Sequence, residues 1–211
     1  MRVLVFGDSI TQGFWDSEGG WVNRLRKYYD EEQIKDLAHK DEPTIFNLGI
    51  SGDVTEGVLN RFENEVKARK WRWPDEEFTF IFAIGINDTA MFLNQEPNVD
   101  NYGTQLKELI LKAKQYSKRI IFVELTPVEE DVANKRPGTN KIRTNDRIKR
   151  FNIQLKSCCN TSGVHFLPIF EEFKERLDIG EDLLADGLHP NNTGHQLIYE
   201  LVKPELEKFL K

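Results

Sequence analysis

Three side chains from opposite ends of the sequence have the chemical types that activate a hydroxyl nucleophile. Ser9 follows a short apolar run, whereas Asp186 and His189 lie close together near the other end of the chain. A serine hydroxyl becomes a good nucleophile only when an imidazole accepts its proton, and a carboxylate orients that imidazole and stabilises its positive charge. The spacing lets Asp186 reach Nδ1 of His189 while Nε2 faces Ser9. These residues predict acyl transfer through a covalent intermediate on Ser9.

Acyl transfer also needs hydrogen-bond donors for the oxygen that becomes negative in the tetrahedral intermediate. We expect the backbone N–H of Ser9, the backbone N–H of Gly49 and the side-chain amide of Asn87 to supply them. Glycine lets its backbone approach a ligand closely, and an asparagine amide offers two N–H groups. Taken one at a time, each of these residues also fits a turn or a helix cap, so the prediction depends on their meeting at one site.

Short apolar segments, bounded by Gly, Pro or polar residues, predict the strands that position these side chains. Apolar residues with helical spacing lie between them, so strands and helices alternate along the chain. This order predicts an α/β fold with a doubly wound, five-stranded parallel sheet, in which ligands bind at the carboxyl ends of the strands. Ser9, Gly49 and Asn87 each follow such a strand. The strands are expected at residues 2–6, 44–48, 78–84, 119–125 and 164–167.

Four short motifs resemble the four blocks of the GDSL or SGNH hydrolase family, in the family's order and over nearly the whole chain. They are GDSI at 7–10, NLGISGD around Gly49, GIND at 85–88 and DGLHP at 186–190. Ile10 stands where the family name has leucine, a change between similar apolar side chains. The resemblance implies the flavodoxin-like, three-layer sandwich of the SGNH hydrolase fold. It also implies these roles: Ser9 as nucleophile, Gly49 and Asn87 as oxyanion donors, and His189 as base with Asp186 behind it.

The family resemblance implies hydrolysis of an ester bond in a small molecule. The sequence contains no metal-binding motif, so we expect no metal and no cofactor. Within the family, a short-chain carboxylic esterase is favoured, and a carbohydrate O-acetylesterase, a lysophospholipase or a thioesterase is the alternative. Two other classes stay open from the residues alone. One is a non-catalytic interaction module on the same fold, and the other is a nucleotide-binding protein, which fold analogy alone suggests and the missing phosphate loop opposes.

Composition limits the remaining possibilities. The 211 residues predict a single domain over 1–211, and the net charge of −6 argues against a nucleic-acid partner. No apolar run reaches the roughly 18 residues of a membrane helix, so we expect no membrane insertion. The two cysteines, Cys158 and Cys159, are adjacent and cannot link distant segments, which favours reduced thiols and a cytoplasmic location.

Several other residues have types that occur at active sites. Ser51 is interpreted as a turn residue, and His165 and His195 as structural histidines without a nearby acid in the sequence. Trp15 is a candidate wall of the acyl pocket, whereas Trp21 is expected to pack the first long helix on the sheet. The irregular stretch from Thr126 to about Thr139 is either a flexible connection or a substrate-contacting loop. The final helix is expected to begin near Asn192 or Thr193 and to be disturbed at Pro204.

Overall fold

A five-stranded parallel sheet forms the centre of the protein. The computed structural model describes residues 1–35, 43–70, 77–93, 95–135 and 140–210. The strand order is β2-β1-β3-β5-β7, with all neighbours parallel. This confirms the predicted sheet, with ends that differ by one or two residues at most positions. The strands are β1 (Arg2–Gly7), β2 (Thr44–Gly49), β3 (Phe78–Ala83), β5 (Ile120–Val123) and β7 (His165–Leu167).

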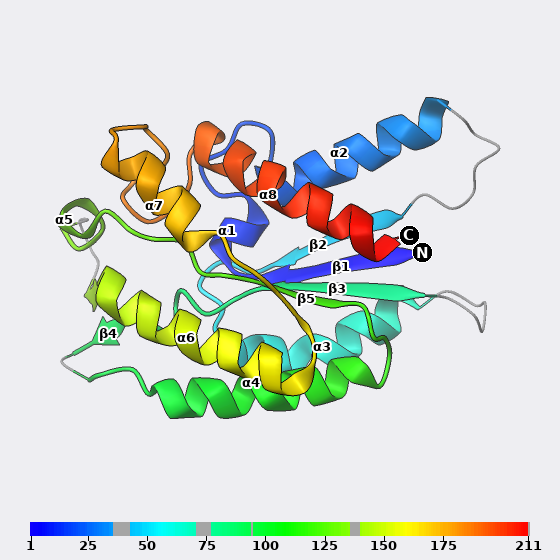
Figure 1. Ribbon diagram of the computed structural model, residues 1–211, viewed down its shortest axis with the longest axis horizontal. Coiled ribbons are helices and arrows are strands. Elements are labelled where there is room, and N and C mark those ends of the chain that lie inside the picture. Colours follow the sequence, from blue (N-terminus) through cyan, green and yellow to red (C-terminus); the bar gives the residue numbers. More distant parts are fainter. Residues whose placement is uncertain (36–42, 71–76, 94, 136–139, 211) are drawn as a thin grey trace.

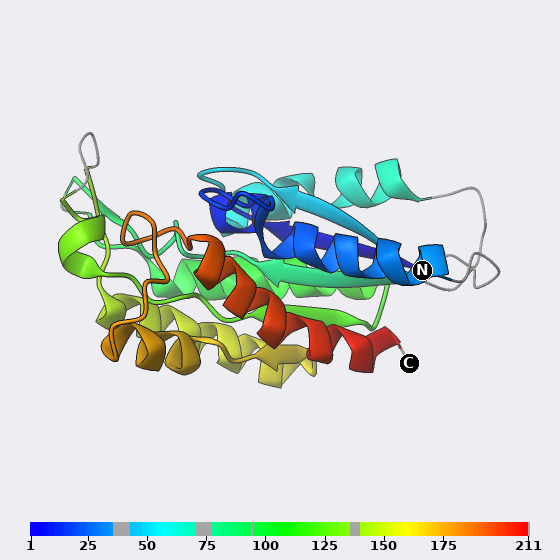
Figure 2. The same ribbon diagram turned by 90° about the horizontal axis from the view of Figure 1, so that it is seen from above.

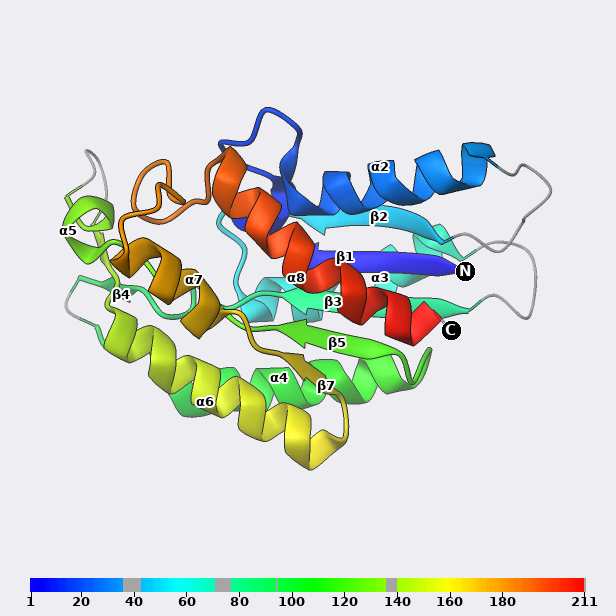
Figure 3. The same ribbon diagram turned by 45° about the horizontal axis from the view of Figure 1, so that its top comes forward.

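Helices cover both faces of this sheet and give the three layers that the sequence predicts. Helices α2 and α8 lie on one face, and α3, α4 and α6 lie on the other (Figures 1 and 2). The carboxyl ends of the strands all point toward the end of the molecule where α5 and β4 lie (Figure 3). The helices are α1 (Ser9–Gln12), α2 (Gly20–Lys35), α3 (Thr55–Arg69), α4 (Val99–Lys114), α5 (Glu130–Ala133), α6 (Asn145–Ser162), α7 (Phe170–Asp178) and α8 (Asn192–Leu210).

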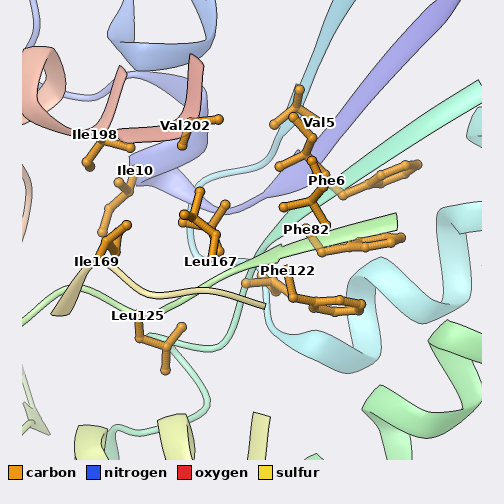
Figure 4. Packing of buried hydrophobic residues seen from close by; sticks show 14 of the residues in the cluster. Val5, Phe6, Ile10, Phe82, Phe122, Leu125, Leu167, Ile169, Ile198 and Val202 are labelled. Atoms are coloured by element: carbon orange, nitrogen blue, oxygen red, sulfur yellow. The ribbon is translucent and has the colours of Figure 1, made fainter. Parts of the chain in front are cut away.

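The core is packed on both faces of the central strands, because their side chains are apolar without alternation. Three aromatic rings tie β1, β3 and β5 together on one face (Figure 4). The ring of Phe82 lies 5.3 Å from that of Phe6 and 4.8 Å from that of Phe122, both nearly parallel to it. On the other face, Ile198 and Val202 bring α8 down on the sheet. Burial of this kind contributes about 25 cal/mol per Å² of apolar surface.

The final helix begins where the sequence predicts and extends further than expected. Helix α8 begins at Asn192, and its cap is Asn191, whose Oδ1 accepts the N–H groups of Thr193 and Gly194 at 2.9 and 3.1 Å. The helix also continues through Pro204 to Leu210. Proline lacks only one donor, and the buried side chains on both sides of it keep the helix on the sheet.

A second, two-stranded sheet was not predicted. Strands β4 (Met91–Phe92) and β6 (Lys141–Ile142) pair in antiparallel fashion beside the carboxyl ends of the main strands. Two-residue strands leave no alternation of polar and apolar residues for sequence reasoning to detect. Their pairing brings residue 143 back toward the loop that follows β3.

Neither cysteine forms a disulfide, since Cys158 and Cys159 are free and buried. Burial raises the pKa of Cys159 to about 12, so this thiol stays protonated and unreactive at neutral pH. Among the helices that the structure describes, none has the length and apolar character needed to cross a bilayer.

Candidate active site

A sharp turn from β1 into α1 positions Ser9. Gly7 ends the strand, and a Cβ at Gly7 would lie 2.4 Å from the carbonyl oxygen of Ala83 on the neighbouring strand. Asp8 then caps α1, because its Oδ1 accepts the backbone N–H of Ile10 at 2.9 Å. The short helix therefore starts with Ser9, whose residue surface is only 5% exposed.

The side chains of Ser9, His189 and Asp186 form one hydrogen-bonded chain. The Oγ atom of Ser9 lies 2.9 Å from Nε2 of His189. The Nδ1 atom of His189 lies 2.9 Å from Oδ2 and 3.1 Å from Oδ1 of Asp186. Ser9 and His189 are 180 residues apart in the sequence. They meet because the end of β1 and the loop before α8 lie at the same edge of the sheet. The arrangement can move a proton from the hydroxyl to the imidazole.

The loop that carries Asp186 and His189 is fixed by its own backbone. Oδ1 of Asp186 accepts the N–H groups of Leu188 and His189 at 3.1 and 2.8 Å. Gly187 lies between them with φ of +78°, a left-handed conformation that glycine adopts without strain. The N–H of Ala185 donates to the carbonyl oxygen of His189 at 2.9 Å, which joins the two ends of the loop. These bonds within the loop hold the carboxylate and the imidazole facing each other.

The electrostatics of this loop favour an ionised Asp186. Its partial burial raises the pKa, but the hydrogen bonds from the His189 ring and from the backbone N–H groups of His189 and Leu188 outweigh it. The pKa of Asp186 is consequently well below its usual range. A permanent carboxylate at this position keeps a proton on Nδ1 of His189 and leaves Nε2 as the acceptor toward Ser9.

Asn87 follows β3, and its amide is fixed at both ends. Its Nδ2 donates to the carbonyl oxygen of Asp53 at 3.0 Å, and its Oδ1 accepts from Nη2 of Arg143 at 2.8 Å. An amide nitrogen has two hydrogens, and Asp53 uses one of them. The second N–H remains for another acceptor, which is the property that the sequence analysis expects of this residue.

Gly49 does not fit the role expected from the sequence. Its backbone N–H already donates to Oδ1 of Asn47 at 2.9 Å. A Cβ at Gly49 would lie 2.3 Å from the backbone nitrogen of Gln12, so glycine is required there for the close approach of β2 to α1. The expectation that Gly49 donates to an oxyanion is therefore corrected: its N–H is paired and its small size serves packing.

Gly52, three residues further along the same motif, was not among the donors expected from the sequence. Gly52 has φ of +80°, and a Cβ added to it would meet no atom within 4 Å. Among the hydrogen bonds of the described residues, none uses the N–H of Gly52. The turn that carries it is anchored to the nucleophile segment, since Ile50 N–H donates to Gly7 and Ser51 N–H donates to Oε1 of Gln12. The GISGD motif contains two glycines, and of these only Gly49 has its N–H paired among the described residues.

The histidines outside the site have structural contacts. His195 is fully buried, with Nδ1 3.4 Å from the N–H of Trp21 and Nε2 3.0 Å from the carbonyl of Phe14. Burial lowers the pKa of His195, which favours the neutral ring that can accept at one nitrogen and donate at the other. His165 lies 3.2 Å from Glu205 of α8, an acid that its sequence surroundings did not reveal.

The aromatic segment after Ser9 divides as the sequence analysis expects. Trp21 is fully buried and packs α2 on the sheet, whereas Trp15 is 58% exposed. The ring of Phe14 packs at 5.7 Å from the imidazole of His189. The ring of Trp15 packs edge-on against the ring of Phe14, with the centroids 6.3 Å apart. A substrate contact of Trp15 stays a prediction.

The stretch from Thr126 to Thr139 packs against the His189 loop over the part that the structure describes, which excludes residues 136–139. The N–H of Glu129 donates to the carbonyl of Gly187 at 2.8 Å. A Cβ at Gly187 would lie 2.6 Å from the backbone nitrogen of Ala133 in α5. This segment therefore supports the loop of Asp186 and His189 from outside.

Asp8 is a buried carboxyl group directly before Ser9. Burial raises its pKa to about 7, and the nearby Asp88 and Asp53 add to the increase while Arg143 opposes it. A raised folded-state pKa means that the folded protein binds a proton that the unfolded chain releases near 3.8. The contribution of this group to stability is therefore complete below pH 3.8 and is lost as the pH rises through about 7.

We expect Asp8→Asn to stabilise the protein at pH 8 by on the order of 1 to 4 kcal/mol and to have little effect at pH 4. Asparagine keeps an oxygen for the N–H of Ile10 but carries no charge to desolvate. Urea denaturation at the two pH values measures the difference. Asp131→Asn is the matched control, because the side chain of Asp131 is 94% exposed. An equal effect of Asp8→Asn at both pH values contradicts the prediction.

Comparisons with known proteins show which family the chain resembles. Residues 5–197 match the model of the GDSL-like Lipase/Acylhydrolase family. The acetylxylan esterase of Geobacillus stearothermophilus is 26% identical over 93% of this chain and 90% of its own length. The human isoamyl acetate-hydrolyzing esterase 1 homolog is 25% identical over 98% of this chain and 82% of its own length.

A solved structure extends the similarity to the whole fold. The lipase/acylhydrolase from Enterococcus faecalis superposes with a TM-score of 0.72 at 25% identity, covering 100% of this chain and 97% of its own. The family match spans far more than half of the sequence and contains all the elements that carry the hydrogen-bonded chain. The protein therefore belongs to the GDSL-like lipase/acylhydrolase family and is an ester-hydrolysing enzyme.

Proposed function

We propose that this enzyme cleaves short-chain carboxylic esters, acetyl esters in particular, through an acyl-enzyme intermediate on Ser9. The observation that carries the proposal is the hydrogen-bonded chain from Ser9 through His189 to Asp186, with its distances of 2.9 Å at both links. These distances lie within the range of a nucleophile and base that exchange a proton. The ester-named relatives support the same reaction class.

In the first half of the reaction, Oγ of Ser9 attacks the carbonyl carbon while its proton passes to Nε2 of His189. The tetrahedral intermediate collapses, the bond to the alcohol oxygen breaks, and the proton on His189 passes to the leaving alcohol. A water molecule then attacks the acyl-enzyme and gives its proton to the same nitrogen. The second intermediate releases the carboxylic acid, and Oγ of Ser9 recovers the proton. Asp186 stays ionised throughout and stabilises the imidazolium.

Three donors are proposed for the oxyanion: the N–H of Ser9, the N–H of Gly52 and the second N–H of Asn87. Gly52 takes the place of Gly49, whose N–H is paired with Asn47. The donors of Gly52 and Asn87 are neighbours, because Nδ2 of Asn87 donates to the carbonyl of Asp53, the residue after Gly52. Donors fixed before the reaction stabilise the developing charge without reorganisation.

The preference for short acyl groups is supported by the two relatives described above, which are named for acetate and acetyl esters. Acetylated sugars and acetates of small alcohols are therefore the substrate classes that we propose.

A chain-length series tests the proposed substrate class. We expect kcat/KM to fall about tenfold or more from p-nitrophenyl acetate to the octanoate, as is expected of an enzyme whose substrates are acetyl esters. Enzyme treated with a fluorophosphonate serves as the blank for uncatalysed hydrolysis. Acetylated xylo-oligosaccharides and isoamyl acetate, compared at equal concentration, then distinguish a sugar from a small alcohol as the leaving group. Faster cleavage of the octanoate than of the acetate contradicts the proposal.

A further inference from the structure

We infer that Arg143 is a positioning residue for the oxyanion amide: its guanidinium fixes and polarises the side chain of Asn87. The inference rests on the proposed function of Asn87 and adds a residue that lies outside the four motifs of the sequence. Arg143 comes from the end of β6 and reaches the loop after β3, so two segments more than fifty residues apart meet at this point.

The side chain of Arg143 is held between two carbonyl-type oxygens of one loop. Its Nη2 donates to Oδ1 of Asn87 at 2.8 Å, and its Nε donates to the backbone oxygen of Ile86 at 3.2 Å. The residue is only 5% exposed. Because the guanidinium is planar and both bonds use the same edge of the group, its orientation relative to the loop is fixed.

Arg143 decides which way the amide of Asn87 faces. A guanidinium can only donate, so the oxygen of the amide must face Arg143 and the nitrogen must face the carbonyl of Asp53. The reversed amide would place two donors against each other on one side and two acceptors on the other. It would also present an oxygen to the oxyanion. The arginine therefore keeps the second N–H of Asn87 available as a donor.

The positive charge has a second effect on the same amide. A hydrogen bond from an ionised donor is shorter and stronger than a neutral one, and it draws electron density toward the amide oxygen. Linked hydrogen bonds strengthen one another in this way, most of all where water is excluded. The N–H groups of Asn87 consequently become better donors, and the gain is largest when the substrate oxygen carries the negative charge.

The backbone of Arg143 is itself clamped by Asn134. The Nδ2 of Asn134 donates to the carbonyl of Arg143 at 2.8 Å, and its Oδ1 accepts the N–H of Arg143 at 2.9 Å. Asn134 directly follows α5, the helix that packs against Gly187 in the loop of the base. One segment therefore supports both the imidazole side and the oxyanion side of the site.

A double-mutant cycle with Asn87 tests the inference. We expect Arg143→Met to lower kcat about 10- to 100-fold on p-nitrophenyl acetate while KM changes less than about threefold, since the lost interaction acts in the transition state. Asn87→Ala should lower kcat about 10²- to 10³-fold. In the Asn87→Ala background, Arg143→Met should cost less than about twofold further, because its effect passes through the missing amide.

Two further variants separate positioning from simple structural support. Arg147→Met is the matched control: Arg147 is a similarly buried arginine on α6, but its partners are Glu96 and the carbonyl of Ile142. It should leave kcat within about threefold of the wild-type value. Arg143→Lys keeps the charge with a single donor group, should recover part of the loss, and serves if the methionine variant does not fold.

Equal losses of kcat from Arg143→Met in both backgrounds, or a KM effect without a kcat effect, overturn the inference and leave the role of Asn87 standing. If Asn87→Ala alone leaves kcat unchanged, the proposed oxyanion role of Asn87 fails and the inference fails with it. Thermal unfolding of each variant identifies losses that come from a smaller folded fraction.

Discussion

Replacing Ser9 with alanine is expected to lower kcat by about 10⁴-fold or more, because no other hydroxyl can take its place beside the base. The Oγ atom of Ser9 has one hydrogen-bond partner among the described residues, Nε2 of His189 at 2.9 Å. Alanine leaves the backbone N–H and the short helix unchanged, so the fold and the donors for the oxyanion remain. A low residual rate above that of water is expected from those donors. Steady-state hydrolysis of p-nitrophenyl acetate measures the loss.

Labelling with a fluorophosphonate provides the second readout. Wild-type protein should gain one phosphonyl group on the peptide that contains Ser9, and Ser9→Ala should gain none. Ser51→Ala is the control, because Ser51 lies in the adjacent turn and only its backbone N–H has a role there, donating to Gln12. It should keep its label and stay within about twofold of the wild-type rate. Near-normal turnover by Ser9→Ala, or a label on another residue, ends the assignment of the nucleophile.

The family and the fold could be predicted from the sequence because each depends on local patterns. Continuous apolar runs such as that of β3 are typical of strands buried on both faces, and the helical spacing between them determines the layers. Three of the four motifs lie at the ends of predicted strands, and the fourth lies in the connection between the fifth strand and the final helix. The parallel order of the strands then brings Ser9 and His189 to one edge.

The parts that escaped prediction depend on contacts between segments that have no pattern of their own. Arg143 lies in an irregular stretch with many charges, and nothing in its spacing distinguishes it from Arg147 or from the solvated lysines nearby. Its role follows only from the pairing of β4 with β6, which are two residues long. The choice between Gly49 and Gly52 likewise depends on which N–H is already paired, a fact that composition cannot reveal.

The site is therefore supported from two directions by one connection of the chain. Between β5 and α6, the segment first contacts Gly187 beside the base and then, through Asn134 and Arg143, contacts Asn87. Catalytic groups need supporting contacts that limit their motion to a small fraction of an ångström. From the sequence, this stretch is either a flexible connection or a substrate-contacting loop. We propose a third role, which is to fix the positions of His189 and Asn87 relative to each other.

Replacing Asp186 with asparagine is expected to lower kcat by about 10⁴-fold while the loop keeps its shape. The asparagine oxygen can still accept the N–H groups of Leu188 and His189, which Oδ1 of Asp186 accepts at 3.1 and 2.8 Å. Its amide nitrogen would donate to Nδ1 of His189, so the ring proton would move to Nε2. That tautomer presents a hydrogen to Oγ of Ser9 and cannot accept the hydroxyl proton.

The low pKa of Asp186 determines how the loss in Asp186→Asn should depend on pH. Burial opposes ionisation of Asp186, but the hydrogen bonds from His189 and Leu188 hold its pKa well below the usual range, so it remains a carboxylate in any mildly acidic assay. The loss in Asp186→Asn should therefore exceed about tenfold at both pH 6 and pH 8, because the wild-type side chain is a carboxylate at either pH. Asp182→Asn is the control, since Asp182 is exposed and its hydrogen-bond partner among the described residues is Asn191 in the same loop. If Asp186→Asn keeps kcat within about tenfold of the wild-type value, the carboxylate does not orient the base, and another group must be sought for that role.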